Sequence, residues 1–582
     1  MDLTPNRIAE IFDEIALLLE LKGENPFKLR AYRQGAEVVR EFDGDLLAMA
    51  RARALSAVKG LGSALQDKLH ELATTGALVF YENLRAEFPP TLFELFELQG
   101  LGPKKIKLLY DTLGIASVAD LVAACAAGKV AALPGFGAKS AAKILEAVAL
   151  RQQFAERFLM GQVANTVEEI LAALRRHPDT LRTQVAGSYR RAKETVQDLD
   201  FMVGTANPAA LTHFFTQLPG VTSIIGSGDT KASVRLKNGL QCDLRAVSNA
   251  QYPFALQYFT GSKEHNVALR QITLKQKLNL NEYGLTPLPG SGVLDPTPAI
   301  HDEADIYRTL GLDFIPPELR ENRGELEAAD KGTLPRLIEL ENLRGTFHCH
   351  TTASDGRAPL AEMVDAARDH GLQYLGISDH SKSSFQARGL DEQRLLQQIT
   401  EIRALNATLD DITLFAGSEV DILRDGSLDF DDAVLAQLDF CVASVHASFS
   451  LSEDEMTRRI IKAMENEHVT MLGHLTGRML LRRDAYAVDH ARIIDCAAAT
   501  RTVIELNATI TRLDMDWRWW HRARDKGVLC SINPDAHHPS HFQNLFFGVR
   551  CARKGWLRRK DVLNTRTLTE IQQFLRTPKA LR

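Results

Sequence analysis

The feature that most restricts the fold is a regular alternation of short strand-like runs and longer helix-like segments after residue 344. Seven such runs occur, at residues 346–350, 374–378, 413–419, 440–446, 469–474, 502–507 and 528–533. Strands that alternate with helices pair in parallel, because each helix returns the chain to the start of the next strand. The sequence therefore predicts a C-terminal α/β domain over residues 344–582, arranged as a (βα)7 barrel.

Metal-ligand side chains follow six of these seven runs. They are His348, His350, Asp355, His380, Glu419, His446, His474, Asp535 and His537. The C-terminal ends of barrel strands form the rim where such domains place their sites. Imidazole combined with carboxylate suits Mn²⁺, Zn²⁺ or Fe²⁺ better than Ca²⁺, so we expect two or three Mn, Zn or Fe ions that assist hydrolysis of a phosphate ester.

Residues 1–150 are predicted to be helical, because apolar residues recur there with a period near 3.6. Three turns share the pattern apolar, Gly, apolar, Gly before a helix, with their glycines at Gly60, Gly62, Gly100, Gly102, Gly135 and Gly137. Such helix–hairpin–helix turns offer backbone N–H groups to a DNA phosphate. A plain helix–helix turn with a glycine cap is the alternative reading of each copy.

A second group of carboxylates lies in a mixed helix and strand region, residues 159–258, predicted to be a nucleotidyltransferase palm. Asp198 and Asp200 are two residues apart on a predicted strand and so face the same way, and Asp243 lies on another predicted strand. Oxygen ligands at this spacing suit Mg²⁺ or Mn²⁺. Upstream, Gly187 and Ser188 form a turn that can contact a phosphate.

The stretches GSYRRAKETVQDLDF, QCDLR and YFTGS resemble the family X DNA polymerases across residues 1–316. The resemblance implies a lyase-like DNA-binding domain (1–85), a fingers domain (86–158), the palm (159–258) and a thumb (259–316). The resemblance implies that Asp198 and Asp200 bind both metals and that Asp243 activates the primer 3′-hydroxyl. It assigns nucleotide contacts to Gly187, Ser188, Arg191, Tyr258, Phe259, Gly261 and Asn266, and a template contact to Arg270. Core packing is the alternative explanation for the two aromatic residues.

Three positions depart from that family. Ala192 and Gln197 stand where glycines are usual, and Gln241 replaces a basic residue that accompanies the third aspartate. Added side chains beside the phosphate turn would crowd the triphosphate, so we predict a slow or Mn²⁺-preferring polymerase. Robust Mg²⁺-supported gap filling would contradict this prediction.

A lyase activity is a further hypothesis. Lys68 matches the family position whose amine forms a Schiff base with an abasic sugar, and Lys28 and Tyr32 match flanking DNA contacts. The alternative is that Lys68 is an ordinary solvated or phosphate-binding lysine.

The C-terminal stretches FHCHTTASDG, GISDH, GSEVDI, SVHASF, LGHLTGR and NPDAHH resemble the PHP (polymerase and histidinol phosphatase) superfamily. The resemblance implies a Mn²⁺-dependent 3′–5′ exonuclease, with abasic-site cleavage as a further expected activity. Arg478, Arg482, Arg483 and Arg512 are candidates for guiding the DNA strand, and solvated surface charge is the alternative.

The remaining sequence suggests a cytoplasmic monomer. The segment 317–343 is charged and proline-flanked and is predicted to be a linker. The seven cysteines are widely spaced, which fits reduced thiols, and no apolar run is long enough to span a membrane. The net charge of −5 excludes a wholly basic nucleic-acid binder but allows local basic patches.

We therefore expect a DNA repair enzyme that fills short gaps and trims 3′ ends, with gapped or nicked DNA, 3′ ends and dNTPs as its partners. One alternative is mainly a structure-guided nuclease with a weak polymerase half. Another is a DNA-binding scaffold with a structural metal cluster. A small-molecule phosphoesterase is a third, against which the DNA-binding N-terminus argues.

Overall fold

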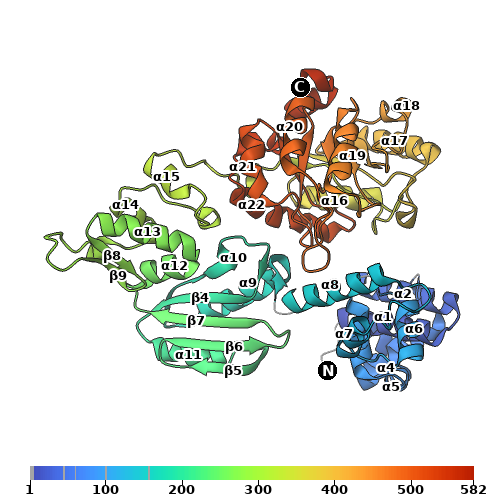
Figure 1. The fold of residues 1–582 in the computed structure, drawn as a ribbon, viewed down its shortest axis with the longest axis horizontal. Helices are drawn as coiled ribbons and strands as arrows, with labels where there is room; N and C mark the ends of the chain where they lie inside the picture. The colour runs from blue at the N-terminus through green and yellow to red at the C-terminus, as the bar shows by residue number, and fades with distance from the viewer. Residues whose placement is uncertain (1–4, 43–45, 59, 99–100, 155–156) are drawn as a thin grey trace. The chain divides into compact units, whose positions relative to one another are not determined.

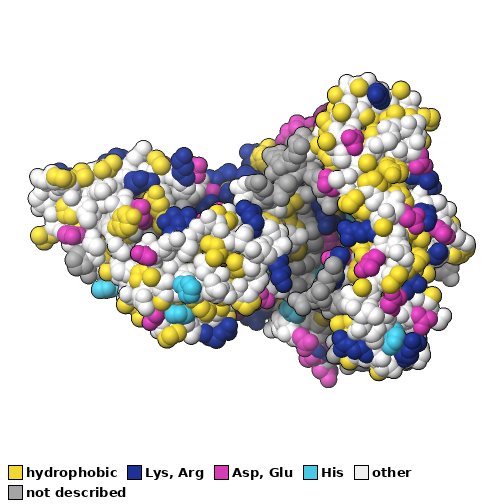
Figure 2. All heavy atoms as spheres, turned by 90° about the horizontal axis from the view of Figure 1, so that it is seen from below, with side chains coloured by type: hydrophobic (Ala, Val, Ile, Leu, Met, Phe, Trp, Pro, Cys, Tyr) yellow, Lys and Arg dark blue, Asp and Glu magenta, His cyan; other side chains and the backbone are white. Residues whose placement is uncertain are grey.

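The computed structural model describes residues 1–582 except 1–4, 43–45, 59, 99–100 and 155–156. The chain divides into two units, Met1–Ala155 and Glu156–Arg582, each with its own internal packing (Figure 1). On the face shown in Figure 2, basic side chains are interspersed with acidic ones, in keeping with the small net charge.

The first unit is helical, as predicted. Its helices are α1 (Pro5–Lys22), α2 (Pro26–Glu41), α3 (Leu46–Arg51), α4 (Ser63–Thr75), α5 (Val79–Ala86), α6 (Pro103–Leu113), α7 (Val118–Ala126) and α8 (Ala138–Phe154). Their apolar faces meet in one core, which includes Phe12, Leu69, Leu95 and Ile106. Asn25 and Ser117 cap α2 and α7 by accepting backbone N–H groups with their side chains.

The second unit begins with a five-stranded sheet in the order β2-β4-β7-β6-β5. Its strands are β2 (Thr180–Val185), β4 (Asp198–Thr205), β5 (Val221–Ser227), β6 (Lys231–Leu236) and β7 (Gln241–Val247). Helices α9 (Met160–Arg176), α10 (Gly187–Arg190) and α11 (Pro208–Thr216) accompany the sheet, and a short pair, β1 (Phe158–Leu159) with β3 (Thr195–Val196), lies beside it.

A thumb-like segment follows the sheet. It contains α12 (Tyr252–Thr260), α13 (Lys263–Lys275), the hairpin β8 (Leu278–Asn281) and β9 (Gly284–Pro287), and α14 (Glu303–Thr309). Leu269, Leu285 and Tyr307 belong to its core.

The segment 317–343, predicted to be a linker, is instead packed against its neighbours. It forms α15 (Glu325–Asp330), whose Leu326 and Ala329 join the core of the thumb. Arg320 is fully buried and donates to the carbonyl of Ile315. The prediction failed because charged residues that are paired inside a protein have the same composition as solvated ones.

The C-terminal domain confirms the predicted α/β barrel. Its strands pair in parallel in chain order: β10 (Gly345–Thr346), β11 (Tyr374–Ile377), β12 (Thr413–Asp421), β13 (Phe440–Ser444), β14 (Met471–Leu472), β15 (Val503–Asn507) and β16 (Cys530–Asn533). The first and last strands approach each other, since the His350 N–H donates to the Ala536 carbonyl (2.8 Å). The sheet is therefore nearly closed.

Helices surround this barrel (Figure 1). They are α16 (Leu360–Asp369), α17 (Glu392–Asn406), α18 (Asp432–Leu435), α19 (Glu453–Glu465), α20 (His490–Thr500), α21 (Trp517–Asp525), α22 (Asn544–Lys554) and α23 (Leu568–Arg576). In the part of the chain that is described, no single helix is both long and apolar enough to cross a membrane, although the bent pair α6 and α7 satisfies that criterion by length and composition.

Candidate active sites

Two neighbouring parallel strands bring three carboxylates together in the five-stranded sheet. Asp200 on β4 lies opposite Asp243 on β7, and Asp198 is two residues before Asp200 on the same face. Burial, reinforced by the charges of Asp198 and Asp243, raises the pKa of Asp200 to about 7. Burial and the charge of Asp243 also raise the pKa of Asp198. Such mutual repulsion is relieved when a cation binds, so the three side chains fit a divalent metal site.

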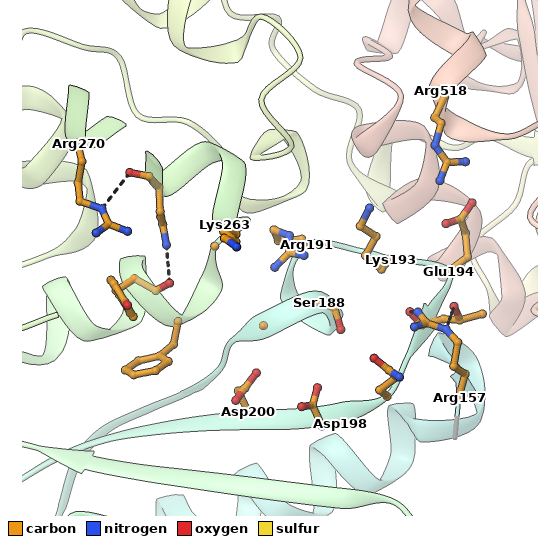
Figure 3. Close-up of a pocket in the computed structure, with 17 residues that line it drawn as sticks. Arg157, Ser188, Arg191, Lys193, Glu194, Asp198, Asp200, Lys263, Arg270 and Arg518 are labelled. Atoms are coloured by element: carbon orange, nitrogen blue, oxygen red, sulfur yellow. Dashed lines mark hydrogen bonds between the residues drawn. The ribbon is translucent and has the colours of Figure 1, made fainter. Parts of the chain in front are cut away.

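The predicted phosphate turn lies directly against these carboxylates. Gly187 has a left-handed φ of +61°, and a Cβ on it would approach Asp200 Oδ2 to 2.3 Å. Only glycine fits this position. Gly187 and Ser188 line a cleft of about 580 Å³ together with both aspartates of β4 (Figure 3).

Arg191 also lines this cleft, but part of its guanidinium is already engaged. It donates to the Thr260 carbonyl (2.5 Å) and pairs with Glu321 (3.1 Å). Thr260 ends α12, and Glu321 lies in the packed segment 317–343. These contacts hold Arg191 in a fixed orientation at the cleft wall.

The opposite part of the cleft carries the residues predicted to contact the sugar and the template. Tyr258 and Phe259 are partly exposed and line the cleft, and Phe259 also packs against the small core that includes Met202. Asn266 donates to the Tyr258 carbonyl (2.8 Å), and the Arg270 guanidinium lies 5.9 Å from the Tyr258 ring centre. Gly261 lines the same wall and has a φ of +70°.

The three departures from the family pattern occupy distinct environments. Ala192 is buried with a left-handed φ of +54°, and Gln197 is exposed and lines the cleft. The Gln241 amide donates to Asp243 Oδ1 (3.0 Å), while Lys231 on the adjacent strand β6 lies 3.6 Å from Asp243 Oδ2. The sequence did not predict Lys231 as part of this site, because the antiparallel pairing of β6 with β7 that brings it close to Asp243 is a tertiary feature.

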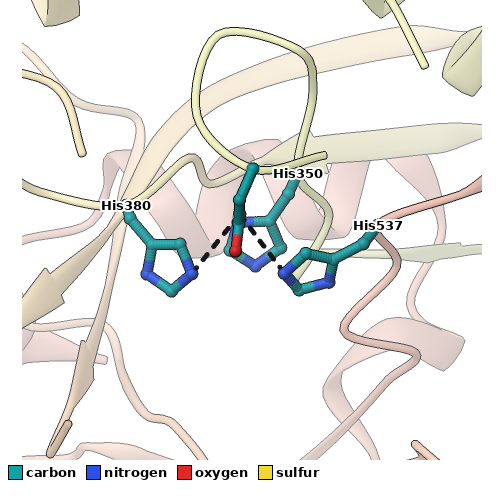
Figure 4. A group of neighbouring side chains, drawn as sticks. His350, His380 and His537 are labelled. Atoms are coloured by element: carbon teal, nitrogen blue, oxygen red, sulfur yellow. Dashed lines mark ion pairs between the residues drawn. The ribbon is translucent and has the colours of Figure 1, made fainter. Parts of the chain in front are cut away.

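All nine predicted ligands of the barrel domain converge at its rim. Three overlapping groups have ligand atoms within 4.8 Å of one another: His350, Asp355, His380 and His537; His348, His350 and Asp535; and His380, Glu419 and His446. The Asp355 carboxylate lies between His380 (3.6 Å) and His537 (3.4 Å), with His350 beside them (Figure 4). His474 joins the set through Glu419, at 2.8 Å.

Several buried ring nitrogens in this cluster have no hydrogen-bond partner. The orphaned atoms include His348 Nε2, His380 Nδ1, His474 Nδ1 and both ring nitrogens of His350. Burial and the neighbouring His537 and His380 lower the pKa of His350 to about 4, which favours the neutral form that binds metals. Buried ring nitrogens without a hydrogen-bond partner, close to carboxylates, fit a site for more than one transition-metal ion.

Two carboxylates that the sequence did not single out hold the imidazoles in place. Glu505 accepts from the His348 ring (2.6 Å) and from the His474 backbone N–H (2.7 Å), and Asp421 lies 2.8 Å from His446 Nδ1. Such contacts orient ligating imidazoles. Glu505 lies in the sixth strand run, which provided no predicted ligand, and its position inside a strand gave no signal in the sequence.

The basic residues predicted to guide DNA at the rim lie in different environments, and Arg482 is exposed. Arg512 lines the cleft of about 670 Å³ above the cluster and lies 3.8 Å from Asp535. Arg478 is only 11% exposed and pairs with Glu194 of the palm (3.2 Å) and with Asp516 (2.8 Å). Arg478 therefore connects the palm to the barrel domain and does not serve as a DNA contact at the rim. Arg483 donates to the Gly477 carbonyl (2.7 Å).

The glycine turns of the first unit lead into helices as expected. Gly62 and Gly102 are the N-caps of α4 and α6, and Gly137 directly precedes α8. Gly60 and Gly135 adopt left-handed φ values, of +92° and +79°. Gly100 lies outside the described residues. A Cβ on Gly62, Gly102, Gly135 or Gly137 would meet no atom within 4 Å, so these turns are open to an approaching phosphate.

Lys68, on α4, is half-buried, and its amine lies 4.9 Å from the ring centre of Phe80. Phe80 stacks on Tyr32, whose side chain is 6% exposed. Tyr32 is therefore mainly a packing residue. Lys28 is exposed near Glu24 (3.5 Å).

Comparison with protein-family models finds a helix-hairpin-helix domain (residues 4–78), a SAM-like helix-hairpin-helix tandem (93–149), a DNA polymerase beta thumb (255–321) and a PHP domain (346–509). The DNA polymerase/3′–5′ exonuclease PolX of Bacillus subtilis is 39% identical over 98% of this chain and 99% of its own length. Shorter relatives match the C-terminal part. A probable phosphatase of Thermoanaerobacter sp. is 24% identical over 40% of this chain and 94% of its own length, and one of Aliivibrio fischeri is 28% identical over 33% and 76%.

The long relative and the thumb, helix-hairpin-helix and PHP matches agree with the two sites described above. The chain belongs to the family X DNA polymerases that carry a C-terminal PHP domain.

Proposed function

We propose that this protein is a DNA repair enzyme that fills short gaps with its palm site and trims 3′ ends with its PHP site. The observation that carries the proposal is the presence of two clusters of metal-ligand side chains in one chain. Three carboxylates lie on a polymerase-like sheet, and histidines with carboxylates lie at a barrel rim. The name of the Bacillus subtilis relative also combines a DNA polymerase with a 3′–5′ exonuclease.

In the palm, Asp198, Asp200 and Asp243 would hold Mg²⁺ or Mn²⁺ ions, which supply Lewis acidity to the transferred phosphate. Asp243 is the group we assign to accept the proton of the primer 3′-hydroxyl. Gln241 and Lys231 hold its two oxygens, so its orientation is fixed before the primer arrives. Ser188 and Arg191 would bind the triphosphate, while Tyr258 and Phe259 would pack against the sugar.

In the barrel domain, the nine clustered residues would hold two or three ions, for which we propose Mn²⁺. When bound, these ions supply charge that stabilises the phosphodiester undergoing cleavage. Glu505 and Asp421 contact the imidazole rings and would orient them, and Arg512, which lines the cleft, would bind the scissile phosphate. Abasic-site cleavage by this site is a further part of the proposal.

The first unit would grip gapped or nicked DNA through the backbone N–H groups of its glycine turns. Lys68 is our candidate for the Schiff-base amine, supported by its half-buried position over Phe80. Borohydride trapping on nicked abasic DNA should yield a covalent adduct that Lys68→Ala abolishes. Trapping that persists in the variant would remove this assignment. We propose that the protein acts as a monomer.

A paired assay on gapped DNA and on DNA with a 3′ flap tests both sites. Asp198→Ala/Asp200→Ala should abolish extension and leave trimming intact, and His537→Ala should do the reverse. Chelation followed by addition of Mn²⁺, Mg²⁺, Zn²⁺ or Fe²⁺ identifies the metal each site uses. We expect extension to be slow or stronger with Mn²⁺ than with Mg²⁺.

Matched controls are Asp229→Ala, an exposed aspartate after β5, and His538→Ala, whose ring contacts Ser540 next to the cluster. Both should retain both activities. Extension that survives loss of Asp198 and Asp200 would remove the polymerase assignment. Trimming that survives His537→Ala would remove the nuclease assignment.

A further inference from the structure

A helix of the PHP domain forms part of the wall of the polymerase cleft. Arg518, in the first turn of α21, lines this cleft together with Ser188, Lys193 and Asp198 of the palm. Figure 3 places Arg518 on the same side of the cleft as Lys193 and Glu194, and away from Arg270. Arg518 therefore completes the polymerase cleft although it lies more than 300 positions after Asp198 in the chain.

The surrounding contacts hold Arg518 in position. Its guanidinium pairs with Asp516 (2.5 Å) and lies 5.0 Å from the ring centre of Trp517, which is itself buried. The guanidinium of Arg323 reaches the Arg518 carbonyl (3.5 Å). The side chain of Arg518 remains half exposed, so its outer N–H groups can reach a ligand in the cleft.

The basic side chains at this end of the cleft share their carboxylates. Arg191 and Lys193, each at 3.1 Å, share Glu321 with Lys554 (2.7 Å). Asp516, the carboxylate beside Arg518, is shared with the buried guanidinium of Arg478, which also engages Glu194. Asp516 thus forms ion pairs with two arginines, and the side chain of Arg518 is the more exposed of the two.

We propose that Arg518 binds the triphosphate of the incoming nucleotide and the pyrophosphate that leaves, so that the PHP domain supplies a substrate contact to the polymerase reaction. This inference rests on the polymerase function proposed above. Negative charge develops on the leaving pyrophosphate as the new phosphodiester bond forms, and a guanidinium stabilises that charge with two parallel hydrogen bonds. The residues already assigned to the triphosphate, Ser188 and Arg191, lie in the same cleft.

The test compares Arg518→Gln with Arg522→Gln in the full chain. Arg522 lies one turn later on α21, is similarly exposed and pairs with Asp495, but it does not line the cleft. Loss of a charge-assisted contact should raise KM for the dNTP and weaken pyrophosphate inhibition by about tenfold or more in Arg518→Gln. Arg522→Gln should match the unchanged protein, and Arg518→Lys should recover part of the loss.

Nucleotide binding is also measured without turnover, by titrating dNTP with Mg²⁺ into the protein bound to a gapped DNA whose primer ends in a dideoxynucleotide. Weaker dNTP binding with unchanged DNA binding supports the proposal. Equal dNTP affinity in Arg518→Gln overturns it, as does weaker DNA binding alone, which would make Arg518 a contact for the DNA backbone. Absence of dNTP binding by the unchanged protein would remove the polymerase function as well.

Discussion

At the residue scale, one buried alanine of the palm has a backbone conformation that favours glycine. Ala192 has a φ of +54° and is 1% exposed. A left-handed residue other than glycine costs roughly 1–2 kcal/mol. Ala192 follows Arg191, whose carbonyl accepts from Lys554 (2.7 Å), so the surrounding contacts enforce this conformation. The strain lies next to the phosphate end of the cleft.

Replacing Ala192 with glycine relieves this strain but removes a buried methyl group and adds backbone entropy to the unfolded chain. These opposing effects should nearly cancel, leaving the free energy of unfolding within about 1 kcal/mol of the original. Ala186→Gly is the matched control, because Ala186 is equally buried but has an extended φ of −120°. It should lose about 1–2 kcal/mol. Equal losses for both variants in denaturant unfolding would show that Ala192 is not strained.

At the element scale, the packed segment 317–343 joins the thumb to the palm and the barrel domain. Glu325 of α15 accepts from the buried ring of His265 on α13 (2.7 Å). Glu321 binds Lys554 of α22 (2.7 Å) as well as Arg191 and Lys193 of the palm. One short segment thus fixes three structural elements by buried ion pairs.

Glu321 should make this junction sensitive to acid. Burial alone would raise its pKa, but the charges of Lys554, Arg191 and Lys193 lower it to about 2. Because the pKa is lower in the folded state, the stabilisation is fully present above about pH 4.5 and is lost as the pH falls towards 2. The shift corresponds to at most about 3 kcal/mol.

Urea unfolding between pH 6 and pH 3 should show this loss, with a shallower pH dependence in Glu321→Gln, which cannot ionise. Glu327→Gln, at an exposed position of α15, serves as the control and should follow the original slope. An identical pH dependence in all three proteins would mean that other carboxylates dominate the acid sensitivity.

At the scale of the whole molecule, the palm and the PHP domain share an extensive interface within the second unit. A Cβ on Gly161 of α9 would come within 2.3 Å of Ile510, and Arg550 of α22 donates to the Tyr189 carbonyl (2.5 Å). Arg478 is central to this interface, because it links Glu194 in the polymerase cleft wall to Asp516 and also donates to the Arg512 carbonyl (2.8 Å). The two sites are therefore held by one network of contacts.

A double-mutant cycle with Arg478→Met and Glu194→Gln measures this connection. Arg478→Met leaves Glu194 buried without its ion-pair partner and Asp516 paired with Arg518 alone, which should cost about 3–5 kcal/mol. The coupling between the two changes should be at least about 1 kcal/mol. The exposed pair Arg492 and Asp454 (3.0 Å) is the control and should contribute less than about 1 kcal/mol. A coupling near zero for Arg478 and Glu194 would show that the pair does not join the domains.

Local patterns in the sequence were sufficient to predict the barrel, its nine clustered side chains and the acidic strand of the palm. The reason is that strand and helix periodicities, and ligand residues placed at strand ends, are set by neighbours in the chain. The glycine turns and their helices were predicted for the same reason. The comparisons and the fold agree with the family that these motifs indicated.

Only the tertiary structure determined how distant segments complete the sites. Lys231 reaches Asp243 through strand pairing, Glu505 orients His348 from another strand, and Arg518 enters the polymerase cleft from the PHP domain. The sequence also presented residues 317–343 as a linker, because composition does not distinguish charges that are paired in the interior from charges in water. The sequence determined which chemical groups each local motif carries, and long-range packing decided which of them act together, since contacts between distant residues leave no periodic signal.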